Sequence, residues 1–443
     1  MLDYEFLKNS YLGIGGFLDG SYIEPFPRET HQRVLKRKKL AINVNLVKKI
    51  VNTITGHLFR KSPIRKIESL AYRTFIENVD MQGTYIDTFM KKVFKLGLIY
   101  GTVFIFVDRP SQKVKTLFEK QTFGVFPYAG IRLPTHLQSY KLDRYGNLDS
   151  ITFKEPDPEN RYISIYRTFT KEEWVISTDV HGKNVISSGT HSLGIVPVIL
   201  YSPMQIEIPG SILSVPFILE IAQIQKAVYN LLSELHSVLR DTAFPIFTFP
   251  IGSPEDIEKL EKEIMTIGTE NAIAYVPQGS ARPDFVAPPP EPAKQILENV
   301  KFLIEQAYEL ANLNFKGGVQ KSGVAKEYDY LEFTKMLSDF AQGLEETEYR
   351  LAQIVSLWED EEFKGYIEYS KEFTPLDKEK VVKTLLEVIN NPEMPREVKK
   401  EATKLLQRML FGDFLDEQRL NELDRIIESE DDFEEKLRKE GLL

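Results

Sequence analysis

Three long amphipathic helical stretches between residues 211 and 358 constrain the fold of this chain more than any other feature. In each stretch apolar residues recur at alternating steps of three and four, which places them along one face of a helix. In chain order they are Phe217, Ile221, Ile224, Val228, Leu231, Leu235 and Val238; Ile296, Val300, Leu303, Ala307 and Leu310; and Phe333, Leu337, Phe340, Leu344, Leu351, Ile354 and Trp358. A helix that leads out, an insert and a helix that leads back predict a stalk with a folded tip. Such a stalk is more typical of assembly than of catalysis.

The composition excludes several classes of protein. The chain has 443 residues, 42% of them hydrophobic, which is enough to bury a large core and to form two to four domains. It has no cysteine, which removes disulfides and thiolate metal ligands and fits an intracellular origin. No apolar stretch reaches the roughly 18 residues of a membrane span, and the first residues lack a signal-peptide pattern. We therefore expect a soluble protein with no membrane contact.

Charge is distributed unevenly along the chain, whose net charge is -9. The segment 28–66 is rich in lysine and arginine and contains one acid, Glu29, whereas the last thirty residues are strongly acidic. A basic segment either meets phosphate or forms the solvated face of helices, and for any single lysine the second is the commoner case.

Helix and strand signals predict a mixed α+β body with a mostly antiparallel sheet. An irregular segment ends at residues 24–27, a helical pattern then runs through Leu58, and a second helix covers about 84–94. Strands are expected at 102–107, 150–154, 162–169, 174–177, 185–188 and 196–201. Hairpin turns are expected at Tyr145-Gly146-Asn147 and His181-Gly182-Lys183.

The insert, residues 244–290, reads as a small α/β unit. Strands are expected at 246–249 and 272–276, and a helix is expected to begin after Ser253. Beyond Leu313 comes a loop, 314–326, in which Gly317 and Gly318 give the backbone freedom to move. A helix from about residue 322 to 362 follows. Shorter helices at 378–389, 395–410 and 416–428 form a C-terminal helical unit.

The motifs of common catalytic sites do not occur. There is no GxxxxGK[ST] phosphate loop, no HExxH metal pair and no GxSxG elbow, and the histidines are scattered. Paired acids such as Glu345-Glu346 and Asp431-Asp432 fit solvated helix faces better than general acid–base pairs. We therefore expect a protein that is not an enzyme and that needs no cofactor or metal.

Three sequence elements occur in a characteristic order. The first element is Pro27-Arg28-Glu29, followed by a basic helix and residues 43–47; Ile50-Val51 then leads to Gly56 and Ser62-Pro63-Ile64. The second element is residues 193–198, just before the first stalk helix. The third element is residues 322–326, at the start of the long helix. Together with the order helix, insert, helix, loop and long helix, they make nearly the whole chain resemble the portal proteins of tailed bacteriophages and related prophages.

The resemblance implies a portal fold with named parts. These are the wing, 1–210; the two stem helices, 211–243 and 291–313; the clip, 244–290; the tunnel loop, 314–326; the long wing helix, 327–372; and the helical crown, 373–443. It also implies a ring, usually of twelve copies, at a unique capsid vertex. Through this ring double-stranded DNA is packaged and ejected. The implied partners are the terminase large subunit, then a head–tail adaptor, and the major capsid and scaffolding proteins. The ring would assemble in the host cytoplasm and become part of the virion.

The expected site residues follow from these parts. Lys316, Lys321 and Lys326 of the tunnel loop would touch DNA, with Gly317 and Gly318 as the hinge. Glu298, Glu305 and Glu309 lie on one face of the returning helix and would line the channel and repel the duplex, with Lys301 spaced to pair with Glu305. Asp256, Glu258, Lys259 and Lys262 are candidate partner contacts on the clip. The alternatives are that these charges form an ordinary solvated face, or that the chain is a long-helix scaffold or adaptor that never contacts nucleic acid.

Overall fold

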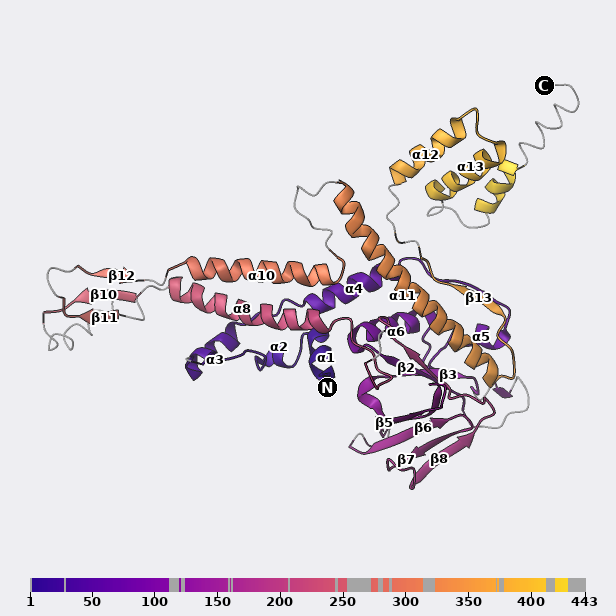
Figure 1. Ribbon diagram of the computed structural model, residues 1–443, viewed down its shortest axis with the longest axis horizontal. Helices are drawn as coiled ribbons and strands as arrows, with labels where there is room; N and C mark the ends of the chain where they lie inside the picture. Colours follow the sequence, from indigo (N-terminus) through magenta and orange to yellow (C-terminus); the bar gives the residue numbers. More distant parts are fainter. Residues whose placement is uncertain are drawn as a thin grey trace, which may run out of the picture. The chain divides into compact units, whose positions relative to one another are not determined.

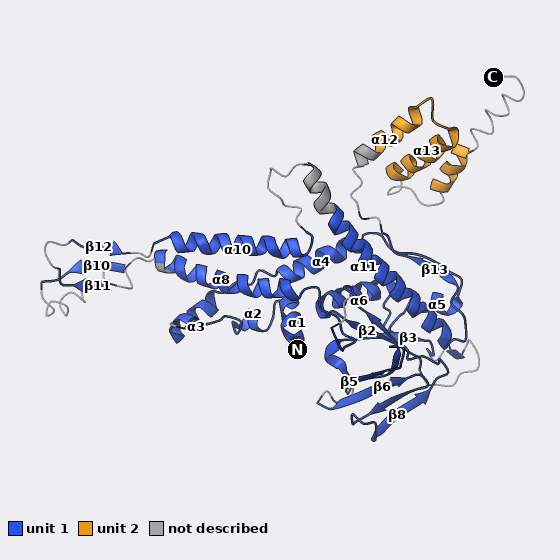
Figure 2. Cartoon of the chain, in the orientation of Figure 1, with its two compact units in different colours: residues 1–373 blue, residues 374–443 orange. Residues whose placement is uncertain are grey.

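The computed structural model describes residues 2–27, 29–110, 119–120, 124–157, 160, 162–205, 208–243, 246–252, 272–277, 282–286, 289–313, 323–371, 373, 378–411 and 419–428. The chain divides into two compact units, Met1–Phe373 and Thr374–Leu443 (Figure 2). Helices and several sheets are mixed in the first unit, as the sequence predicts. None of the helices within the described ranges is both long and apolar enough to cross a bilayer.

The first unit begins with four helices: α1 Tyr4–Leu12, α2 Gly16–Asp19, α3 His31–Leu40 and α4 Leu46–Leu58. The expectation of an irregular N-terminal segment is wrong. The Asp3 side chain caps α1 by accepting a hydrogen bond from the Phe6 amide, and Gly13 ends the helix with a φ of 74°. The helical pattern through Leu58 is also two helices instead of one, because the Asn45 side chain caps a new helix, α4, by accepting from the Lys48 amide at 2.8 Å.

The stem helices, α8 Leu219–Ala243 and α10 Glu291–Leu310, pack against each other. Helix α3 packs against α8, and in Figure 1 α8 lies between α3 and α10. Between α8 and α10 the chain forms a three-stranded sheet, the tip sheet, from β10 Ile246–Pro250, β11 Ala272–Tyr275 and β12 Asp284–Val286. Strand β10 is central, parallel to β11 and antiparallel to β12. The first two strands were expected and β12 was not; the helix expected after Ser253 lies outside the described residues.

The body is organised around one buried strand. Strand β2, Val103–Asp108, is buried at all six positions and pairs with β3 Tyr128–Arg132 and β9 Val198–Tyr201, both antiparallel. Side chains alternate across a strand. Val103, Ile105 and Val107 accordingly join the main helical core, while Phe104 and Phe106 join a second core with aromatic residues of the five-stranded sheet.

The five-stranded sheet is an antiparallel meander in the order β4 to β8. Its strands are β4 Leu137–Leu142, preceded by a 3₁₀ turn at Pro134–His136, β5 Leu148–Pro156, β6 Ser164–Thr170, β7 Glu173–Ser177 and β8 Val185–Thr190. The two predicted hairpin turns are confirmed. Gly146 and Gly182 occupy them with φ angles of 85° and 68°, which favour glycine.

The long helix α11, Gly323–Trp358, crosses the body and packs against α4, α5, α6 and β9. Its start at Gly323 confirms the helix start expected near residue 322, which overlaps the loop range 314–326, and it ends before residue 362. Its end is a tight turn in which the Glu359 and Glu361 amides donate to the Ser356 carbonyl and Asp360 has a φ of 56°. The remaining elements of this unit are β1 Ile64–Ile67, α5 Leu70–Phe75, α6 Ile86–Tyr100 and β13 Gly365–Glu368. Strands β1 and β13 form a separate antiparallel pair.

The second unit is helical in its described part, as the sequence predicts. Helices α12 Lys378–Asn390 and α13 Arg396–Phe411 pack on each other. Residues 419–428 are also helical, and their side chains meet α13 through the ion pairs Lys404–Glu428 at 3.0 Å and Arg408–Asp424 at 2.6 Å.

Candidate functional site

The stem helix α8 has two opposite faces with different partners. Ile221 and Val228 are buried in the main core, in the same cluster as Val300 and Ala307 of α10. The other face carries Lys226, Asn230 and Ser233, whose side chains bond to the N-terminal segment. One apolar face and one polar face, each covered by a different helix, make α8 the middle layer of the stem.

Arg37 joins α3 to the polar face of α8. Its side chain is 2% exposed, and its Nη1 forms an ion pair with Glu29 at 2.6 Å and donates to the Glu24 carbonyl at 3.3 Å. Its Nε and Nη2 donate to the Ser233 hydroxyl at 3.2 and 3.1 Å, and the guanidinium lies 4.9 Å from the centre of the Phe26 ring. A guanidinium with donors in a fixed fork suits this many partners. The basic segment is therefore partly structural, because one of its cations faces inward.

Gln225 fixes two further helices to α8. It is fully buried, and its Oε1 accepts from the Val47 amide while its Nε2 donates to the Ser10 carbonyl, both at 3.0 Å. The first bond satisfies an amide in the first turn of α4, which has no partner within its own helix. Helices α1, α3 and α4 are thus each tied to α8 by a buried polar side chain.

The predicted acidic face of α10 exists. Glu298, Glu305 and Glu309 are exposed, and at 3.6 residues per turn they lie on the side of α10 opposite the buried Val300 and Ala307. Gln306 donates to Glu309 at 2.7 Å. The expected ion pair between Lys301 and Glu305, both within the described part of α10, is not formed, and Lys301 is exposed.

The other predicted site residues give less information. Lys316, Gly317, Gly318 and Lys321 lie outside the described residues, as do Asp256, Glu258, Lys259 and Lys262 of the expected clip. The backbone of Lys326 belongs to α11, which begins at Gly323, so this residue was wrongly placed in the loop.

A buried charge cluster holds α11 against the body, and sequence reasoning missed it. Glu348 is 0% exposed; its two carboxylate oxygens accept from Nε and Nη2 of Arg65 at 2.6 and 2.9 Å. The hydroxyls of Tyr72 and Tyr369 donate to the same oxygens at 2.9 and 2.5 Å, and Asp87 pairs with Arg65 at 2.6 Å. The sequence does carry a signal, because Glu348 stands four residues after Leu344 and three before Leu351, where the helical spacing calls for an apolar residue.

The environment of the cluster shifts the ionisation of its members. Burial raises the pKa of Tyr72 and Tyr369 well above the ordinary tyrosine value, so both remain hydroxyl donors. Burial alone would lower the pKa of Arg65, but the hydrogen bonds and negative charge of Glu348 outweigh it and raise that pKa. Both carboxylate oxygens of Glu348 are hydrogen-bonded and its charge is paired with that of Arg65, which suits a structural role.

The C-terminal end of α11 is held by a second polar group. Arg109 donates to the Trp358 carbonyl at 2.7 Å and stacks 5.5 Å from its ring, and the Trp358 indole donates to the Val107 carbonyl at 3.3 Å. Nearby, burial raises the pKa of Asp108, which accepts from the Tyr128 hydroxyl at 3.2 Å. These contacts connect α11 to β2, so the C-terminal half of the long helix is fixed to the body at two places.

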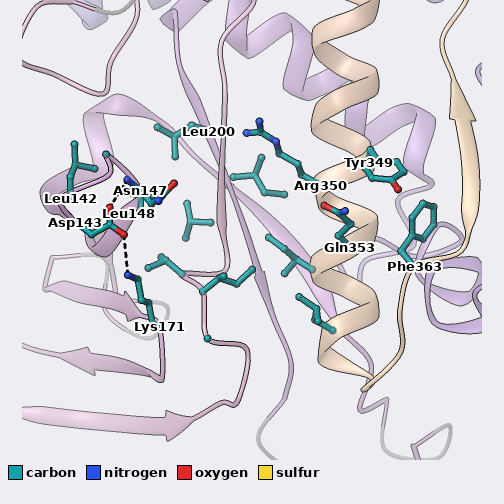
Figure 3. Close-up of a pocket in the computed structure, with 18 of the residues that line it drawn as sticks. Leu142, Asp143, Asn147, Leu148, Lys171, Leu200, Tyr349, Arg350, Gln353 and Phe363 are labelled. Carbon is teal, nitrogen blue, oxygen red and sulfur yellow. Dashed lines mark hydrogen bonds and ion pairs between the residues drawn. The ribbon is translucent and has the colours of Figure 1, made fainter.

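A groove of about 990 Å³ lies between α11 and the β4–β5 turn (Figure 3). Tyr349, Arg350 and Gln353 project from α11 on one side, and Lys171 pairs with Asp143 at 3.3 Å on the other. Most of the remaining lining is apolar. The groove therefore combines apolar area with an ion pair whose side chains, Lys171 and Asp143, are 36% and 22% exposed.

The comparisons with known proteins concern the fold alone. No protein-family model matches the sequence, and no curated protein matches it either. One similar solved structure is the neck of an empty gene transfer agent particle, computed with C6 symmetry; the match covers 90% of this chain and 99% of that chain, with 11% identity and a TM-score of 0.48. Another is the virion of a native gene transfer agent particle, with 93% and 99% covered, 10% identity and a TM-score of 0.44.

Proposed function

We propose that this chain is a portal-type subunit, copies of which form a ring that conducts double-stranded DNA into and out of a phage-like particle. The observation that carries the proposal is the construction of the stem. Two long helices run out of an α+β body and back, a small sheet forms between them, and three N-terminal helices are tied to the first by Arg37 and Gln225. This is the element order on which the sequence resemblance to portal proteins rests.

A channel through which DNA slides passively can make only a few strong contacts with the DNA phosphates. Each cation that neutralises a phosphate adds salt-dependent affinity, so a channel lined with many such contacts would hold the duplex instead of letting it slide. We propose that Lys316, Lys321 and Lys326 make a few transient phosphate contacts and that Gly317 and Gly318 allow the loop to follow the duplex. No catalytic role and no cofactor form part of this proposal.

The tip sheet is the proposed docking surface for other proteins. Strands β11 and β12 and the residue just after β11 expose a group of apolar side chains: Ile273 51%, Val276 57%, Phe285 53% and Val286 53%. Exposed apolar groups of this kind mark interaction surfaces. We assign the terminase large subunit and then the head–tail adaptor to this surface, with Asp256, Glu258, Lys259 and Lys262 as the charged contacts around it. The capsid and scaffolding proteins would contact other parts of the ring.

The first test is negative-stain electron microscopy of the purified protein, with its mass in solution measured alongside. We expect rings with a central channel of roughly 20 Å or more, wide enough for a duplex whose major groove alone is about 12 Å. A chain that stays monomeric at all concentrations, with and without a scaffolding protein, would overturn the proposal. It would favour the second candidate, a long-helix adaptor that does not contact nucleic acid. The same stem geometry could serve such an adaptor.

A further inference from the structure

The layering of the stem leaves two helix faces pointing away from each other. Helix α3 contacts α8 where Arg37 donates to Ser233, which lies on the same face of α8 as Lys226, and α10 packs on the side of Val228. Lys226 and Val228 are two residues apart, which turns the second about 200° from the first around the helix axis. The outer face of α3 and the outer face of α10 are therefore on opposite sides of α8, and they cannot meet within one copy.

The outer face of α10 is acidic. It carries Glu298, Glu305 and Glu309, with Glu291 in the first turn, and Phe302 among them is 56% exposed. Lys294 and Lys301 lie along one border, so the helix keeps an excess of acids. Within the described part of the chain, neither Glu298 nor Glu305 has an ionic partner.

The outer face of α3 is basic. Arg37 points inward to Ser233, so at 3.6 residues per turn the residues opposite it are Leu35 and Lys39, with Lys36 beside them. Lys36 and Lys39 are exposed, Leu35 is 44% exposed, and α3 contains no acid. Of the described residues, none forms an ion pair with Lys36 or Lys39. Each face thus presents an exposed apolar side chain flanked by charges of one sign, and the two signs are opposite.

We propose that the acidic outer face of α10 in one copy docks on the basic outer face of α3 in the next copy. Surfaces on opposite sides of a subunit that fit each other give a head-to-tail contact, which closes into a ring when the rotation between copies allows it. Complementary charge fixes the register of such a contact and speeds its formation. The inference rests on the proposed ring and names its subunit boundary. It assigns Glu298, Glu305 and Glu309 to that boundary instead of to the channel wall expected from the sequence.

Charge reversal tests the contact. One variant carries Lys36→Glu and Lys39→Glu; the other carries Glu305→Lys and Glu309→Lys. Each places like charges across the boundary, and we expect its self-association to weaken at least about tenfold, measured by mass in solution and by the fraction of rings in micrographs. A matched control carries Lys48→Glu and Lys49→Glu, at two exposed lysines of α4. It changes the net charge by the same amount as the first variant and should assemble normally. Thermal melts establish that every variant folds.

Mixing the two reversed variants is the decisive step. In the mixture an acidic α10 of one variant meets the basic α3 of the other, and a basic α10 meets an acidic α3. We therefore expect the two variants to co-assemble although neither assembles well alone, and we expect all four substitutions in one chain to restore rings. A face that is merely solvated, or that lines a channel, cannot produce this rescue.

The remaining outcomes are distinct. Rings that form normally from both reversed variants would overturn the contact while leaving the proposed ring in place, and a change in DNA retention in those rings would return the acidic face to the channel wall. Weakened assembly without rescue in the mixture would also overturn the contact. Wild-type chains that never associate would overturn the ring and the contact together.

Discussion

The cluster around Glu348 and the outer faces of the stem use the same residue types in opposite ways. Glu348 is fully buried and accepts four hydrogen bonds, from Arg65, Tyr72 and Tyr369. Glu298 and Glu305 are exposed and have no ionic partner among the described residues. A charge whose partners lie in its own chain maintains the fold. A stripe of charges without ionic partners among the described residues, with opposite charges on the far side of the stem, is what the proposed contact between copies would use.

The largest effect should come from Glu348→Gln, which removes the charge that pairs with buried Arg65. Breaking a buried ion pair by removing one partner costs about 3–5 kcal/mol, because the other charge stays buried. We expect the free energy of unfolding to fall by that amount in denaturant titrations. Glu346→Gln changes an exposed acid of the same helix and should cost less than about 0.5 kcal/mol. Equal effects of the two substitutions would break the comparison.

Arg37→Met should have the next largest effect. Met preserves much of the side-chain volume but leaves Glu29, only 5% exposed, without its cation. Loss of charged hydrogen bonds of this kind costs roughly 1.5–3 kcal/mol. Because α3 would no longer be fixed to α8, amide hydrogen exchange in α3 should accelerate and ring formation should weaken. Lys39→Met is the control for stability, and it should leave exchange in α3 unchanged.

The reversed outer faces should change stability least among the charge substitutions. Lys36, Lys39, Glu305 and Glu309 are exposed, and surface substitutions usually stay within about 0.5 kcal/mol. We expect the denaturant midpoint to stay within that range while self-association falls. A reversed variant whose loss of stability matched that of Arg37→Met would show that these charges maintain the fold after all.

A small pH effect should come from histidines that the fold keeps uncharged. Burial lowers the pKa of His57, His136 and His191 below the ordinary value of about 6.5. Below that value the unfolded chain binds more protons than the folded chain, so stability is present at neutral pH and is lost as the pH falls. We expect the melting temperature to decrease modestly between pH 7 and pH 5.5. His57→Gln should reduce this slope.

Much of the fold could be predicted because its signals are local. The apolar spacing of α8, α10 and α11 and the glycines at positions 146 and 182 depend on residues close together in the sequence. Helix α1 was missed because it depends on the Asp3 cap and on packing against α8, and α2 was missed because it depends on Phe17 packing against Tyr229 of α8. Strands β1 and β13 were missed because each is short and finds its partner far along the chain.

The candidate site was predictable only in part for the same reason. Periodicity alone placed the three glutamates of α10 on one face, and the structure agrees. The sequence of the basic segment did not predict which lysines of α3 face outward, because that depends on the inward position of Arg37. The relation between the two faces depends on α8 lying between them, and no local pattern contains that information.

The cluster that holds α11 also has a consequence for how the protein is made. Arg65 and Glu348 are 283 residues apart in the sequence. At synthesis rates of about 5–20 residues per second, Glu348 leaves the ribosome roughly 15–60 s after Arg65. For most of that interval α4, α5 and α6 are already made but lack both the counterion and the long helix that completes their core. The nascent chain therefore depends on protection from aggregation until β13, which lies beyond α11, has been translated and can pair with β1.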